Sequence, residues 1–176
     1  MSSFNKGIRK AEVTLKWDPS PRGAPAADLD IVAAVYRADD PYDNPVYLVH
    51  FGSRSPDGTI TLHRDSKTGQ GFGTDEQMTI ELERLSQEYG RVVLGVAIQQ
   101  REGRLEFGDI QGTSMRVAEG YTELLSSEFG TVARATSATV AEFVREADGT
   151  WDMHETVRGF DAEPEEFTGL MGVRQR

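Results

Sequence analysis

The sequence contains no cysteine, so disulfides, thiolate metal sites and cysteine nucleophiles are all excluded. It also lacks a long apolar run, which argues against a membrane-spanning helix. Residues 1–17 have no apolar core of the length that a secretory signal needs. These absences predict a cytoplasmic protein without membrane insertion.

Positive charge is scarce as well. The chain has 19 Lys and Arg against 29 Asp and Glu, which gives a formal net charge of -10. An acidic surface repels a phosphate backbone, and no basic stripe interleaved with aromatic residues offsets this repulsion. We therefore expect no nucleic-acid partner. The 176 residues suit one well-packed domain, and no linker or internal repeat divides 1–176.

Strand patterns dominate what is present. Residues 11–17 alternate apolar and polar side chains, whereas 29–36 and 46–51 are short apolar runs suited to a sandwich interior. Turn sequences such as Pro56-Asp57-Gly58 and Asp148-Gly149 separate the runs. The pattern predicts an all-β fold, either a sandwich or a barrel, with one or two short helices. The remaining predicted strands are 78–82, 92–98, 113–117, 122–125, 131–144 and 151–157.

Helix patterns are sparse. Partial helical spacing occurs only in 75–89, and its second half, 82–89, is the predicted helix. The tail 163–176 is expected either to form a short helix or to trail without structure. Trp17 and Trp151 lie in predicted strands, where we expect them to be core residues and not ligand-stacking platforms.

An acidic loop with alternate glycines runs from Asp65 to Glu76. Glycine permits positive φ, so backbone carbonyls in such a loop can converge, and carboxylates stand at both of its ends. Calcium binds this mixture of carboxylate and carbonyl oxygens. The composition therefore predicts a cation loop, with a polar connection between strands as the alternative. The glycines are Gly69, Gly71 and Gly73, and the closing acids are Asp75 and Glu76.

Two similar motifs do not fit this loop. An EF-hand requires oxygen-bearing side chains at the positions of Lys67 and Gly69. A phosphate-binding P-loop requires a Gly-Lys-Ser/Thr ending, which is missing, and the glycine spacing differs from a dinucleotide fingerprint.

A second acidic pair, Asp28 and Asp30, opens a predicted strand. Residues two apart on a strand point to the same face, so these carboxylates stand together while Leu29 enters the core. Neighbouring carboxylates repel each other unless a cation or a proton intervenes.

In chain order, these pieces resemble the TerD domain family of tellurium-resistance and stress proteins. The resemblance covers roughly 13–160. It implies an all-β, two-sheet β-sandwich that binds calcium, commonly two ions, and acts without catalysis in the stress response by binding other proteins. The matching pieces are Trp17-Asp18, Asp28-Leu29-Asp30, the loop 65–76, Glu142-Phe143-Val144-Arg145, Gly149-Thr150-Trp151 and Gly159-Phe160.

The resemblance also implies a set of calcium ligands and loop-shaping residues. Where the family has carboxylates, this chain has Gln70 and Thr74, and Arg64 adds a positive charge beside the loop. Calcium affinity follows the ligand charge. We therefore expect one calcium ion; two ions, weakened binding and loss of the metal remain alternatives. The implied residues are Asp28, Asp30, Asp65, Ser66 in place of the family's Asn, Thr68, Gly69, Gly71, Asp75 and Glu76.

Other functional classes stay open beside this one. A metal-independent interaction scaffold is one, and a calcium-dependent lectin or C2-like binding module is another. Enzymatic activity is not expected, because no nucleophile elbow occurs. The three histidines, His50, His63 and His154, are widely spaced without an i, i+4 pair, so surface or strand positions are favoured over a zinc or general-base role. A monomer or weak oligomer is expected.

Overall fold

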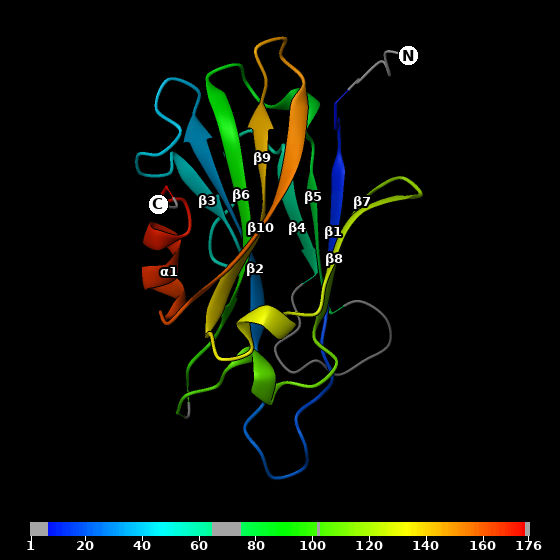
Figure 1. The fold of residues 1–176 in the computed structure, drawn as a ribbon, viewed down its shortest axis with the longest axis vertical. Helices are drawn as coiled ribbons and strands as arrows, with labels where there is room; N and C mark the ends of the chain where they lie inside the picture. The colour runs from blue at the N-terminus through cyan, green and yellow to red at the C-terminus, as the bar shows by residue number, and fades with distance from the viewer. Residues whose placement is uncertain (1–6, 65–74, 102, 175–176) are drawn as a thin grey trace.

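The computed structural model describes residues 7–64, 75–101 and 103–174, which form two five-stranded antiparallel sheets packed face to face (Figure 1). The first sheet has the order β4-β5-β1-β7-β8, and the second has the order β10-β9-β6-β2-β3. The predicted all-β sandwich is confirmed. The strands are β1 (Ala11–Lys16), β2 (Leu29–Arg37), β3 (Tyr47–Val49), β4 (Ile60–Arg64), β5 (Glu76–Ile80), β6 (Tyr89–Ile98), β7 (Ser114–Glu119), β8 (Thr122–Ser127), β9 (Ser137–Arg145) and β10 (Trp151–Phe160).

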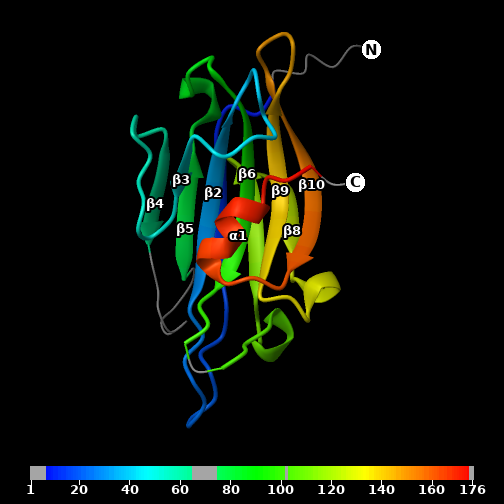
Figure 2. The ribbon, with the colours of Figure 1, turned by 90° about the vertical axis from the view of Figure 1, so that its left-hand side faces the viewer.

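One short α-helix, α1 (Pro164–Leu170), follows the last strand and lies on the outer face of the second sheet (Figure 2). The tail thus forms the helix that was one of its two expected outcomes. Among the described residues, no helix has both the length and the apolar character to cross a membrane. The described part of the chain also contains three single 3-10 turns: Leu82–Arg84, Phe107–Asp109 and Gly130–Val132.

Two apolar clusters explain the burial pattern of the strands. On β1, Ala11, Val13 and Leu15 are fully buried between the sheets, while the residues between them are partly exposed. Strand β2 is buried on both faces, because Leu29 and Ile31 enter the main core and the alternate residues pack beneath α1. Trp17 and Trp151 belong to the main core, as predicted.

The helix predicted for 82–89 is wrong. Only Leu82–Arg84 forms a single 3-10 turn, and β6 already begins at Tyr89. Leu82 and Leu85 are both buried in the main core. This turn connects β5 in one sheet to β6 in the other, so the apolar spacing reflects a crossing of the core and not a helical face.

Two strand predictions also need correction. The strand predicted for 131–144 begins too early, because Gly130–Val132 is a 3-10 turn and β9 starts at Ser137. Strand β4 was not predicted, although its sequence alternates; it is an edge strand that pairs only with β5. The two predicted turns are confirmed by the positive φ of Gly58, +73°, and of Gly149, +88°.

Candidate metal centre

Four of the predicted ligands lie where two strands of opposite sheets begin. Asp28 directly precedes β2 and Asp30 is its second residue, while Asp75 directly precedes β5 and Glu76 opens it. Both strands start at the lower end of the sandwich in Figure 1. We call these four residues the carboxylate cluster. The other predicted ligands, Asp65, Ser66, Thr68, Gly69 and Gly71, lie outside the described residues.

Glu76 joins the two sheets. Its Oε1 accepts a hydrogen bond of 2.7 Å from the backbone N–H of Ile31 on β2, and Glu76 itself is fully buried. The short edge strand β3 pairs with β2 only from Ala33 to Val35. Ile31 therefore lies beyond the end of β3. Its backbone N–H donates instead to a side chain of the other sheet, Glu76. The hydrogen bond is charge-assisted, which makes it stronger than a neutral one.

Asp75 is held to the same region through Trp17. Its Oδ2 accepts a hydrogen bond of 2.8 Å from the backbone N–H of Trp17, just after β1. The indole N–H of Trp17 donates in turn to the carbonyl of Ala27, at 3.1 Å. Since Ala27 directly precedes Asp28, the buried Trp17 connects the backbone before β2 to the carboxylate before β5. The Trp-Asp and Asp-Leu-Asp motifs are therefore coupled in space.

Asp28 and Asp30 have partners that the sequence reasoning missed. The side-chain amide of Gln99 donates to Oδ2 of Asp30 at 2.5 Å, and the Arg101 guanidinium lies 2.9 Å from Oδ2 of Asp28. Both partners follow β6, which pairs with β2 so that Leu29 stands opposite Ile98. The sequence carries no signal for this pairing, and only the register of the two strands reveals it.

The burial of the cluster is its main energetic feature. Asp28, Asp30, Asp75 and Glu76 are each at most 4% exposed. Taking a carboxylate out of water costs several kcal/mol unless charge and hydrogen bonds compensate. Arg101 supplies one positive charge to this end of the sandwich, but its side chain is 61% exposed. The four carboxylates are thus buried at the starts of β2 and β5.

A cleft of about 580 Å³ opens beside Asp30, between the outer face of the second sheet and the first turn of α1. Leu29 enters the main core as predicted, and Asp30 lies on the opposite face of β2 with Val32. Burial lowers the pKa of His50, which also lines the cleft, below its ordinary value. At pH 7 the imidazole is therefore neutral and adds no positive charge opposite Asp30.

The model of the TerD domain matches residues 1–168, nearly the whole chain. The chain belongs to the TerD family. The resemblance seen in the motifs is thereby confirmed, and the family contains proteins of tellurium resistance and of the stress response.

Three relatives place the chain within the family. A crystal structure of a homologue of telluride resistance protein (TerD) from Streptomyces coelicolor A3(2) is 53% identical and superposes with a TM-score of 0.94, covering 96% of this chain and 100% of that one. Tellurium resistance protein TerD of Alcaligenes sp is 23% identical over 91% of this chain and 85% of its own. Stress response protein SCP2 of Bacillus subtilis (strain 168) is 29% identical over 79% of this chain and 77% of its own.

Proposed function

We propose that this TerD-family protein binds one calcium ion at the carboxylate cluster and acts without catalysis, as a cytoplasmic module that binds other proteins. The observation that carries this proposal is Glu76, a fully buried carboxylate that connects β5 of one sheet to β2 of the other. Three further buried carboxylates, Asp28, Asp30 and Asp75, lie at the starts of the same two strands. A monomer or weak oligomer suffices, because all four come from one chain.

The donor set fits calcium. Calcium prefers oxygen ligands, several of them carboxylates, in a flexible arrangement of six to eight. A carboxylate has about four lone-pair sites, so one that accepts a hydrogen bond can also bind a cation. Bound calcium would place positive charge among these buried carboxylates. The proposed ligands are Asp28, Asp30, Asp75 and Glu76, with Asp65, Ser66, Thr68, Gly69 and Gly71 from the acidic loop.

The burial of the cluster supports a binding role over a catalytic one. With exposures of 4% or less, these carboxylates are covered by the protein and present little surface to a substrate. Asp75 and Glu76 accept hydrogen bonds from the backbone of Trp17 and Ile31, which is a structural role. We infer that the ion holds the strand ends in place, so that loops at this end of the sandwich present a fixed surface to a protein partner.

Calorimetry of the metal-stripped protein tests the proposal. We expect calcium to bind with a stoichiometry of one and magnesium to bind more weakly, because magnesium demands near-ideal octahedral geometry. The substitutions Asp75→Ala and Asp65→Ala should each weaken calcium binding at least tenfold. The matched control Asp39→Ala changes a carboxylate whose side chain is 69% exposed and should leave the affinity unchanged. No heat at millimolar calcium would favour the metal-independent scaffold. Calcium-dependent binding to anionic liposomes would favour the C2-like alternative.

Arg101 competes with a cation at Asp28, so Arg101→Gln is expected to raise the calcium affinity. The guanidinium lies 2.9 Å from Oδ2 of Asp28, and its side chain is 61% exposed. An exposed ion pair contributes up to about 1 kcal/mol, so its removal should strengthen calcium binding by up to about fivefold. Calorimetry at low salt measures the change. Arg116→Gln, an exposed arginine paired with Glu123, is the control. Unchanged or weaker binding in Arg101→Gln would show that calcium does not engage Asp28.

A further inference from the structure

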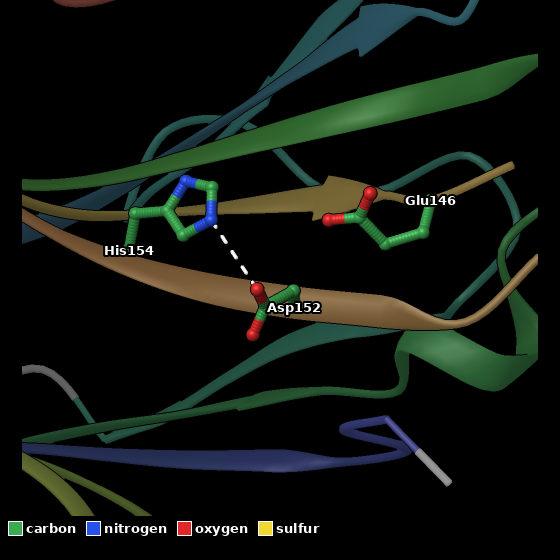
Figure 3. Close-up of side chains that lie close together, drawn as sticks. All are labelled: Glu146, Asp152 and His154. Atoms are coloured by element: carbon green, nitrogen blue, oxygen red, sulfur yellow. Dashed lines mark ion pairs between the residues drawn. The ribbon is translucent and has the colours of Figure 1, made fainter. Parts of the chain in front are cut away.

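A second group of metal-ligating side chains lies at the other end of the sandwich. Glu146, Asp152 and His154 each offer one ligand atom, and these atoms all lie within 4.8 Å of one another. Figure 3 shows the Glu146 carboxylate pointing toward the other two side chains. The group lies near the β9–β10 turn, whereas the carboxylate cluster lies where β2 and β5 begin (Figure 1). The two sites are therefore separate.

The hairpin register brings these three residues together. Asp152 and His154 are two apart on β10, so their side chains share one face of the sheet. On β9, Glu142 stands opposite His154, and Glu146 follows the end of the strand. Backbone hydrogen bonds from Glu146 to Thr150 and from Gly149 to Glu146 close the turn and fix the position of Glu146. The spacing of histidines along the sequence gave no sign of this group.

A carboxylate lies behind the imidazole of His154. Oε1 of Glu142 lies 3.6 Å from Nδ1 of His154, and Oε2 of Glu142 accepts a hydrogen bond of 2.9 Å from the buried Arg91. A carboxylate on one ring nitrogen favours the tautomer protonated there and leaves a lone pair on the other. Nε2 faces Oδ2 of Asp152, and in the tautomer protonated at Nδ1 it presents a lone pair there. Metal-bound histidines in proteins have this kind of outer carboxylate partner.

The distance between the facing ligand atoms fits a zinc-class ion. Nε2 of His154 and Oδ2 of Asp152 are 3.3 Å apart. In a tetrahedral zinc site with metal–ligand bonds of about 2.0–2.1 Å, two ligand atoms are separated by about 3.3 Å. A lone pair and a carboxylate at this distance repel each other unless a cation or a proton lies between them. The imidazole selects zinc, nickel or copper over calcium and magnesium, which prefer oxygen ligands.

We propose that Glu146, Asp152 and His154 form a surface site for a divalent transition-metal ion of the zinc class, completed by water. Three protein ligands and an open fourth position are the arrangement of an accessible zinc site. Glu146 and His154 are exposed, so an ion can reach the site from solvent. This proposal does not depend on the calcium site.

The test uses the full chain, which is first stripped of metal. It is then kept in excess calcium, so that any calcium site is filled before zinc is added. Zinc chloride is titrated in by calorimetry. We expect one zinc ion per chain, with His154→Gln and Asp152→Asn each lowering the affinity at least tenfold. His154 is 49% exposed, so the substitution should leave the fold intact. The control His50→Gln changes a histidine outside the group and should bind zinc as the unsubstituted chain does.

Long-range 1H–15N spectra of the histidine rings give a second readout. Zinc should shift Nε2 of His154 to the metal-bound range while Nδ1 keeps its proton, and the rings of His50 and His63 should not change. Equal zinc affinity in His154→Gln, or no shift at the His154 ring, would overturn the proposal and leave only polar contacts between His154 and its acidic neighbours. Because calcium binding is measured separately, failure of either site is distinguishable from failure of the other.

Discussion

Replacing Glu76 by glutamine is expected to remove most of the thermal stabilisation that calcium gives, while the calcium-free protein stays nearly as stable as before. The amide oxygen of glutamine can still accept the hydrogen bond from the Ile31 N–H, now 2.7 Å long. The substitution removes one buried negative charge. Without calcium this relieves repulsion among the buried carboxylates, so the melting temperature should stay within about 2 °C of the original or rise. With calcium, a ligand is lost.

The size of this effect follows from linkage. A ligand at one hundred times its Kd stabilises the folded state by about 2.7 kcal/mol. For a chain of this length, each kcal/mol corresponds to roughly 2–4 °C, so calcium should raise the melting temperature by about 5–11 °C. Thermal unfolding with chelator and with excess calcium measures the shift in each variant.

A control variant separates the buried site from general surface charge. Glu123→Gln makes the same chemical change on β8 of the same sheet, where the side chain is 52% exposed, and should keep the full calcium shift. If Glu76→Gln keeps the full calcium-induced rise in melting temperature as well, calcium binds elsewhere or stabilises the protein independently of β5. If it unfolds without calcium, the charge of Glu76 is needed for the fold itself.

Local patterns were enough to predict an all-β fold of the sandwich or barrel type, because each strand carries its own periodicity. The alternation of β1 and the apolar run of β2 reflect one buried face and two buried faces respectively, as the structure shows. The prediction failed at Leu82 and Leu85. Two leucines three apart satisfy a helical pattern, but here they enter the core from the connection between two sheets. Periodicity alone cannot distinguish these two causes of burial.

The candidate sites depend on strand register to different degrees. The motif at Asp28 and Asp30 was visible in the sequence, because the two residues are neighbours on one strand. Arg101 reaches Asp28 only because β6 pairs with β2, and His154 meets Glu142 only because β9 pairs with β10. Register is fixed by long-range pairing and by the burial of one face, so short motifs do not determine it. Residues contributed by a paired strand were accordingly the ones missed.

Phe167→Ala is expected to give the largest loss of stability among these variants. Phe167 of α1 is fully buried in the second apolar cluster, on the outer face of β2 and β6. Gly95 of β6 provides the space for its ring: a Cβ at that position would lie 2.7 Å from the phenylalanine ring. Truncating a buried phenylalanine costs about 3–5 kcal/mol, through lost transfer free energy and the cavity left behind. The melting temperature should fall by roughly 10 °C, measured by thermal unfolding.

Phe51→Ala is the matched control, because it removes the same side chain from a position that is 56% exposed and should cost well under half as much. Phe167 packs on the face of the second sheet opposite the main core, so its loss should detach α1 and leave the inter-sheet core intact. Calcium should then still stabilise Phe167→Ala by the same increment, since Glu76 and Asp75 bond to the backbones of Ile31 and Trp17. If calcium no longer stabilises Phe167→Ala, the carboxylate cluster instead depends on α1, which lines one side of the cleft beside Asp30.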